Sequence, residues 1–145
     1  MKFTISMIPV AKGRVKMGRW GAYTPKKTVE AEAMIRQQVL DQMNPEECRM
    51  QPMTGALYLK VIFYMPIPKS LSKKKQVLLE NTPHTKKPDL DNLIKTFDAL
   101  NGILWADDSQ ICTIMAEKKW SKEGKIEIEV LPKQTPQHGV WIQIG

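Results

Sequence analysis

The sequence predicts an α+β fold, a single mixed or antiparallel sheet with helices packed on one side. Strand-like and helix-like hydrophobic periods follow one another in the order β, α, β, α, α, β, β. Residues 56–65 are nearly continuously apolar and β-rich, which is typical of a central strand. Residues 24–44 and 89–101 carry apolar side chains along one face, which suits helices that cover one side of a sheet.

The size and charge of the chain narrow the function. We expect residues 1–145 to form one domain, because that length is sufficient for one core. The net charge of +7 and a pI of about 9.4 favour an anionic partner, most often nucleic acid, and we expect no small-molecule substrate. Two cysteines without paired spacing suit a reducing cytoplasm. No apolar run is long enough for a bilayer, so we expect no membrane association.

The N-terminal segment is basic. Residues 2–10 alternate apolar with polar and predict a strand, and residues 11–23 predict a glycine-rich loop. Residues 1–27 contain seven Lys or Arg and no Asp or Glu. Such a loop can lay cations and backbone amides along DNA phosphates. The DNA-binding candidates here are Lys12, Arg14, Lys16 and Arg19. Trp20 and Tyr23 either stack on an unpaired base or are buried in the core.

The remaining elements follow from local signals. Thr24 as N-cap and Pro25 at the first turn predict a helix that ends near residues 44–45, followed by a loop to residue 55. A short helix within 70–80 is capped by Ser70 or Ser72. Residues 110–120 and 125–131 predict a hairpin joined at 121–124. Residues 132–139 predict a linker, and 140–144 either an edge strand or a partner contact.

Residues 86–110 concentrate the charged groups that suggest chemistry. At about 100° per residue, the apolar side chains of 89–101 fall in one stripe, and Asp91, Lys95 and Asp98 lie on the opposite face. Gly102 suits the left-handed position that ends such a helix. Asp107 and Asp108 follow shortly afterwards. The N-terminal end of an amphipathic helix therefore carries two carboxylates, those of Asp89 and Asp91, and the lysine Lys95.

Clustered carboxylates repel one another unless a cation or a hydrogen-bond donor compensates. Mg²⁺ takes oxygen ligands and usually needs only one or two carboxylates besides substrate phosphate. Asp89, Asp91 and one of Asp107 or Asp108 can supply such ligands, and Lys95 can reach a phosphate oxygen. Lys86 and Lys87 stand beside these carboxylates as further DNA-binding candidates. The pattern therefore favours metal-assisted hydrolysis of a phosphodiester.

An ordinary structural role is also compatible with these residues. An Asp-x-Asp at a helix start often only caps the helix and complements its dipole. Asp91 and Lys95, four residues apart, can form a simple surface ion pair. The spacing excludes an EF-hand calcium loop.

The longer motif is more specific. It consists of Lys-Pro-Asp-Leu-Asp-Asn-Leu-Ile-Lys at 87–95, Phe-Asp-Ala-Leu-Asn-Gly at 97–102 and Trp-Ala-Asp-Asp-Ser-Gln-Ile at 105–111. It resembles the RusA family of Holliday junction resolvases, small homodimeric endonucleases that cut four-way DNA junctions symmetrically with Mg²⁺. The resemblance implies that Asp89, Asp91 and Asp108 bind the metal and that Lys95 is catalytic. Asp107 matches the first member of the family's Asp-Asp pair, and whether it ligates or orients its neighbour stays open.

The resemblance thus implies a homodimer acting on branched DNA in recombination and repair. A four-way junction has two-fold symmetry, and a C₂ dimer presents two identical sites to it. Two alternatives remain open. One is a less selective nuclease for branched DNA, and the other is a DNA-binding module without catalysis.

Overall fold

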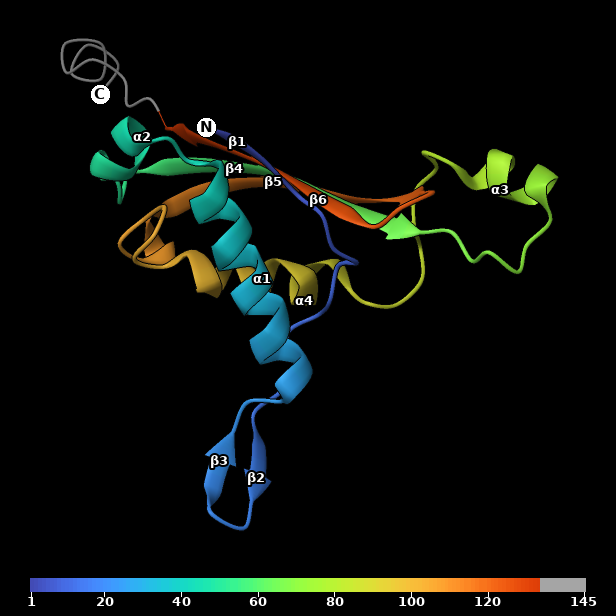
Figure 1. Cartoon of the computed structure of the whole chain (residues 1–145), viewed down its shortest axis with the longest axis horizontal. Coiled ribbons are helices and arrows are strands. Elements are labelled where there is room, and N and C mark those ends of the chain that lie inside the picture. The colour runs from blue at the N-terminus through green and yellow to red at the C-terminus, as the bar shows by residue number, and fades with distance from the viewer. Residues whose placement is uncertain (134–145) are drawn as a thin grey trace, which may run out of the picture.

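A four-stranded sheet organises the protein (Figure 1). The computed structural model describes residues 1–133. The sheet has the order β1-β6-β4-β5, and its strands are β1 (Lys2–Ile5), β4 (Leu57–Pro66), β5 (Ile111–Ser121) and β6 (Lys125–Pro132). β4 is antiparallel to β6 and parallel to β5, while β1 is antiparallel to β6. The predicted α+β class is therefore confirmed, with a mixed sheet and β4 as its predicted central strand.

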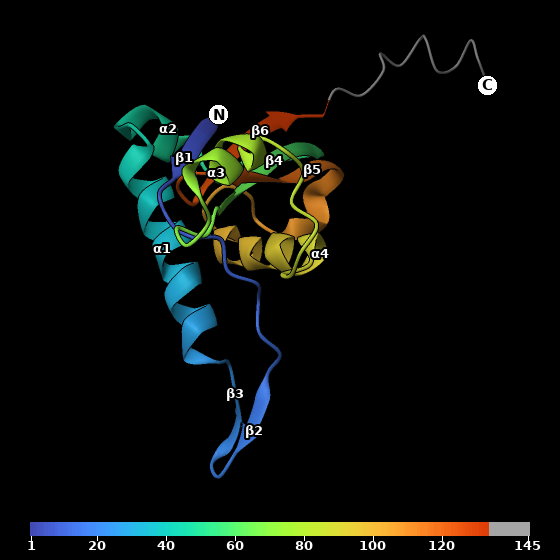
Figure 2. The ribbon, with the colours of Figure 1, turned by 90° about the vertical axis from the view of Figure 1, so that its right-hand side faces the viewer.

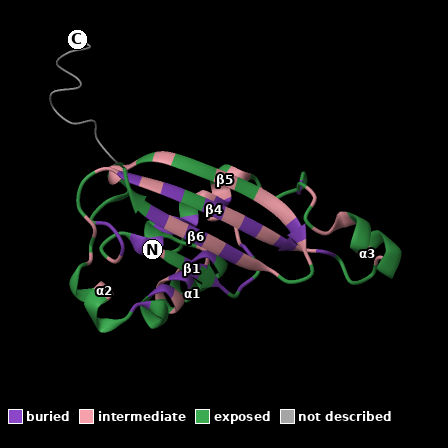
Figure 3. Cartoon of the chain, turned by 90° about the horizontal axis from the view of Figure 1, so that it is seen from above, coloured by how far each residue is buried: buried purple, intermediate pink, exposed green. Residues whose placement is uncertain are grey.

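Three helical segments cover one face of this sheet (Figure 1). They are α1 (Lys26–Gln42), α4 (Leu90–Ile94) and the 3₁₀ helix η1 (Lys95–Leu100). Alternate residues of β4 are buried, and Phe63 stacks on Phe97 of η1 with ring centroids 5.7 Å apart. This contact fixes the segment that carries the predicted site residues onto the central strand. Along β4 and β6, buried residues alternate with less buried ones (Figure 3), because successive side chains point to opposite faces of the sheet.

The predicted hairpin of residues 110–120 and 125–131 is wrong. Both strands exist as β5 and β6, but β4 lies between them and pairs with each. The connection through 121–124 crosses the end of β4, where the Ile67 amide donates to the Ser121 carbonyl at 2.8 Å. A turn pattern reports only that two strands reverse direction, and it contains no signal for a third strand that enters from elsewhere in the chain.

Several helix ends also differ from the prediction. Helix α1 begins at Lys26, and its N-cap is Pro25 rather than Thr24, without a side-chain cap. The predicted loop 44–55 contains a short helix, α2 (Pro45–Arg49), because Asn44 and Glu47 form a capping box. The predicted short helix is confirmed as α3 (Lys73–Leu79), with Ser72 as its cap. It lies beyond one end of the sheet (Figures 1 and 3).

The N-terminal segment also departs from the prediction. The first strand ends at Ile5, before the expected residue 10. The predicted loop 11–23 contains a two-stranded hairpin, β2 (Lys16–Gly18) and β3 (Gly21–Tyr23), which projects away from the rest of the protein (Figures 1 and 2). Trp20 in its turn is 92% exposed, so the burial of Trp20 that the sequence left open is excluded.

Two predictions fall wholly or partly outside the described residues. These are the linker beyond residue 133 and the segment 140–144. Within residues 1–133, no helix is both long enough and apolar enough to cross a membrane.

Candidate active site

The predicted helix 89–101 is two helical segments in succession. The α-helical turn α4 follows Asp89, which occupies its N-cap position, and continues as the 3₁₀ helix η1. A 3₁₀ helix has about three residues per turn, so side chains at i and i+3 eclipse. Lys95 and Asp98 therefore line up, and Asp91 lies one α-helical turn before Lys95. The predicted charged face is thus present, and Gly102 has the expected positive φ of 82°.

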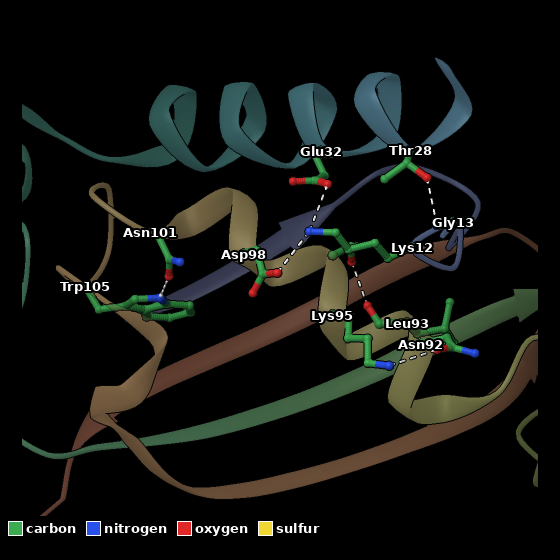
Figure 4. A network of polar contacts seen from close by, with 11 residues as sticks. Lys12, Gly13, Thr28, Glu32, Asn92, Leu93, Lys95, Asp98, Asn101 and Trp105 are labelled. Atoms are coloured by element: carbon green, nitrogen blue, oxygen red, sulfur yellow. Dashed lines mark hydrogen bonds and ion pairs between the residues drawn. The ribbon is translucent and has the colours of Figure 1, made fainter. Parts of the chain in front are cut away.

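Asp98 is held by a lysine from a distant part of the chain (Figure 4). The Lys12 ammonium lies 2.9 Å from Asp98 Oδ2 and 3.6 Å from Glu32 Oε1 on α1. The Lys12 amide also donates to the Asn92 carbonyl at 2.9 Å. Partial burial opposes the effect, but the hydrogen bond to Asp98 and the charge of Glu32 raise the pKa of Lys12. The charge of Lys12, a DNA-binding candidate from the sequence, is thus matched by two carboxylates.

Asp108 belongs to a hollow beside η1. Its lining joins apolar residues of β4, β5 and Trp105 to three charged groups, Lys95, Asp98 and Asp108. A hydrogen bond with Asp98, burial and the charge of Asp107 raise the pKa of Asp108. The hollow has a volume of about 170 Å³, room for several water molecules at ~30 Å³ each. Two carboxylates and the Lys95 ammonium therefore line one hollow, and Asp98 is also held by Lys12.

Asp107 has a different role from its neighbour in this structure. It is the N-cap of the 3₁₀ turn η2 (Asp108–Gln110), and its carboxylate accepts from the Ser109 amide at 3.1 Å. Hydrogen bonds from Ser109 lower the pKa of Asp107. Gln110 completes the capping box and donates to the carbonyls of Met53 and Gly55 at 2.9 and 3.0 Å. Asp107 thus fixes the turn that presents Asp108.

Asp89 and Asp91 lie at the other end of the charged face. Lys87 contacts Asp89 at 2.8 Å, with half of the Asp89 side chain exposed. The hydrogen bond and charge of Lys87 lower the pKa of Asp89, and the charge of Lys118 adds to this effect. The side chains of Lys86, Lys87 and Asp91 are exposed as well.

A lysine of β5, Lys118, holds residues 86–91, here called the acidic turn, against the sheet. The Lys118 ammonium donates to the carbonyls of Lys86 and Pro88, at 2.7 and 2.8 Å. The Lys118 carbonyl accepts from the His84 amide at 3.0 Å, so the preceding loop is held as well. Sequence reasoning missed Lys118 because one lysine in an alternating strand carries no motif. Only its opposite orientation to Lys119 was predictable.

His84 contributes packing to the same loop. It is buried, and its ring lies 4.3 Å from the ring of Trp120. Burial, followed by the charge of Lys118, lowers the pKa of His84. The imidazole is therefore neutral near pH 7 and lies inside the protein rather than on a phosphate-facing surface.

The structure brings the predicted site residues together only in part. Asp108 and Lys95 share one hollow, whereas Asp89 and Asp91 lie at the start of α4. Among residues 1–133, no three His, Cys, Asp or Glu side chains approach closely enough to hold a metal ion. The donor chemistry nevertheless suits Mg²⁺, since these exposed groups are carboxylate oxygens and Mg²⁺ retains several waters. Each part of the site offers at least one carboxylate.

The other DNA-binding candidates are exposed. Arg14 precedes the hairpin, and Lys16 and Arg19 lie within it. Lys86 and Lys87 are exposed beside Asp89. Exposed basic side chains therefore form two groups, one in and before the hairpin and one beside Asp89.

Comparison with known proteins places these features in a class. Residues 7–131 match the family model described as "Endodeoxyribonuclease RusA", and the match includes every predicted catalytic and metal-binding residue. The class is thus that of the endodeoxyribonucleases. The chain belongs to the RusA family, as the resemblance in its acidic motif predicted. It is also 34% identical over 139 residues to "Uncharacterized protein YqaN" of Bacillus subtilis (strain 168), which covers 90% of this chain and 94% of the relative.

Proposed function

We propose that the protein is a Mg²⁺-dependent endonuclease that resolves four-way DNA junctions in recombination and repair. The observation that carries this proposal is the family match, which spans the whole acidic segment 86–110. The proposed enzyme acts as a homodimer in the cytoplasm. A four-way junction has two-fold symmetry, so paired sites in a C₂ dimer would cut two opposed strands symmetrically.

In this proposal Asp89, Asp91 and Asp108 hold the metal. Bound Mg²⁺ would supply Lewis-acid stabilisation and an activated water for phosphodiester hydrolysis. Lys95 is exposed, lines the hollow with Asp108 and lies one turn from Asp91. From this position its ammonium can neutralise charge on the reacting phosphate or on the leaving oxygen.

The ion pair between Lys87 and Asp89 allows Lys87 to change partners. Lys87 is 86% exposed and Asp89 is 50% exposed, and solvent screening makes such an exposed pair weak. A DNA phosphate can therefore replace Asp89 as the partner of Lys87 at little cost. The Asp89 carboxylate would then be available to a cation. Lys86, Arg14, Lys16 and Arg19 would contact the DNA backbone and supply affinity that depends on salt.

One observation favours a second candidate function. The three proposed ligands do not form a metal-binding group within the described residues. A junction-binding module that lacks catalysis, with Asp89 only starting a helix, agrees with that arrangement. This candidate predicts junction binding through the same basic side chains but no strand cleavage.

Junction cleavage by wild type and Asp91→Asn tests the proposal. Labelled four-way junction, flap and linear duplex would be incubated over a titration of Mg²⁺, with Ca²⁺ and chelator as controls. We expect wild type to cut the junction only with Mg²⁺, and Asp91→Asn to bind but not to cut. Equal cutting of flaps would indicate the less selective nuclease. Junction binding without any cutting would support the non-catalytic module, and light scattering would measure the proposed dimer.

A further inference from the structure

The segment of residues 14–23, which contains the hairpin of β2 and β3 and is here called the arm, projects from the protein (Figures 1 and 2). Within the described residues β2 pairs with β3 alone, and every residue of both strands is exposed. An isolated two-stranded hairpin is marginally stable in water. Such a projection gains little for the fold itself, which suggests that its purpose is contact with another molecule.

The root of the arm is fixed beside the candidate active site (Figure 4). The Gly13 amide donates to Thr28 Oγ1 on α1 at 2.8 Å. Lys12 contacts Asp98 through its side chain and Asn92 through its backbone. The arm therefore extends from a defined point next to α4 and η1.

The arm exposes unusually large apolar side chains. Trp20 is 92% exposed, Met17 80% and Val15 63%. Tyr23 lies across Gly18, where an added Cβ would come within 2.9 Å of the tyrosine ring. Tyr23 is 51% exposed, so Trp20 in the turn is the more exposed of the two rings. Neighbouring exposed apolar groups of this size mark an interaction surface.

The charges around Trp20 identify the partner. Arg14, Lys16 and Arg19 are exposed, and within the described residues none of them pairs with a carboxylate. The first acidic residue of the chain is Glu30. The Arg19 guanidinium lies 5.5 Å from the centroid of the Trp20 ring. Aromatic rings interleaved with cations are typical of surfaces that stack on unpaired bases and hold the adjoining phosphates.

A second copy of this chain fits the arm less well. Each copy carries a net charge of +7, and the arm itself has no negative group to offset its cations. Like charges would therefore oppose the approach of an arm to most of a partner's surface. A nucleic-acid strand, by contrast, offers both the π-faces and the negative charge that the arm lacks.

We propose that the arm recognises the branch point of DNA by stacking Trp20 on an unpaired base. Arg14, Lys16 and Arg19 bind the phosphates that flank this base. The branch-point part rests on the proposed function, whereas stacking on an unpaired base does not require cleavage. From Gly13 to Gly18 the chain can extend at most about 17 Å at ~3.3 Å per residue.

Fluorescence of 2-aminopurine placed at the branch point tests this inference. Full-length protein would be titrated in Ca²⁺ into a four-way junction and into a linear duplex with the same label. The variants are Trp20→Ala, Trp20→Phe and, as a control for an exposed apolar side chain on α2's end, Met50→Ala, which is 71% exposed in wild type. Substitution at such exposed positions leaves the core intact.

We expect wild type to change the fluorescence of the junction label, since stacking alters 2-aminopurine emission. Trp20→Ala should lose this change and bind the junction about ten-fold more weakly, in the range measured for base–aromatic contacts. Trp20→Phe should keep most of the signal because it retains a ring, and Met50→Ala should match wild type.

Unchanged junction affinity and fluorescence in Trp20→Ala would overturn the inference. So would dissociation of a dimer in light scattering without any change in the 2-aminopurine signal, because the arm would then bind a second copy. The proposed function fails separately. If wild type never cuts DNA with Mg²⁺ but shows the Trp20-dependent signal, the nuclease proposal is wrong and the arm inference stands. If wild type cuts junctions and the signal ignores Trp20, only the arm inference is wrong.

Discussion

Replacing Lys118 by methionine should loosen the acidic turn without disturbing the sheet. Methionine keeps an unbranched stem but removes the ammonium that donates to the Lys86 and Pro88 carbonyls at 2.7 and 2.8 Å. A hydrogen bond to a charged group contributes ~1.5–3 kcal/mol. Lys118 is half-buried and the Lys86 carbonyl is exposed, so solvent reduces this to about 1 kcal/mol per bond.

The expected consequence is a weaker apparent affinity for Mg²⁺. A loss of ~2 kcal/mol from the ordered turn corresponds to a decrease of up to about thirty-fold in the population of the ordered turn. We therefore expect the midpoint of junction cleavage in a Mg²⁺ titration to rise by up to about thirty-fold. The rate at saturating Mg²⁺ should remain close to that of wild type. Amide hydrogen exchange in residues 85–91 should become faster, and this measurement does not depend on catalysis.

Lys119→Met is the matched control. Lys119 is the next residue of β5, and its side chain points to the opposite face. It lies 3.4 Å from Glu117 in a partly exposed pair. Lys119→Met changes the net charge by the same amount as Lys118→Met. Comparing the two variants therefore separates the effect of the lost hydrogen bonds from the effect of the lost charge. Lys118→Arg should restore part of the loss because the guanidinium can donate to both carbonyls. A Lys118→Met protein with a wild-type Mg²⁺ midpoint and wild-type exchange would refute the positioning role.

Three further predictions follow from the site and the core. The pKa of Asp108 is raised in the folded protein, so its contribution to stability is complete below the ordinary carboxyl pKa and is lost as pH rises through the raised value. Asp108→Asn should thus raise the melting temperature slightly at pH 7 and abolish cleavage, and calorimetry that found a lower melting temperature would contradict this. Lys12→Met leaves Asp98 and Glu32 without their cation and should cost ~1 kcal/mol in urea unfolding, while Lys26→Met, at an exposed i,i+4 pair, should cost almost nothing. Phe97→Ala removes a buried ring stacked on Phe63 and should cost ~3–5 kcal/mol in urea unfolding, and a cost below 1 kcal/mol would show that the packing is wrong.

Local patterns in the sequence predicted much of the charged face. The alignment of Asp91, Lys95 and Asp98 depends on helical spacing, and it survives the change from α to 3₁₀ because i, i+3 and i+4 neighbours share a face in both. The glycine at 102 and the cap at Ser72 are also local, and both are confirmed. The metal ligands and the DNA contacts remain predictions.

Local sequence patterns could not predict the contacts between residues far apart in the chain. The Lys12–Asp98 contact joins residues 86 positions apart, and Lys118 reaches carbonyls about 30 positions upstream. Every residue has a backbone carbonyl, so the sequence contained no signal that Lys118 would donate to those of Lys86 and Pro88. The insertion of β4 between β5 and β6 is likewise a property of the whole sheet, and a two-segment pattern cannot contain it.

The Lys12 contacts have a further consequence for the whole protein. Through these contacts the base of the arm is joined directly to α4 and η1, because Lys12 is hydrogen-bonded to both Asn92 and Asp98. A movement of the arm that displaced Lys12 would alter these bonds. If binding of a base to Trp20 displaces Lys12, that binding is thermodynamically coupled to the arrangement of the carboxylates, equally in both directions. Cation binding should consequently report on arm engagement, as arm engagement reports on cation binding.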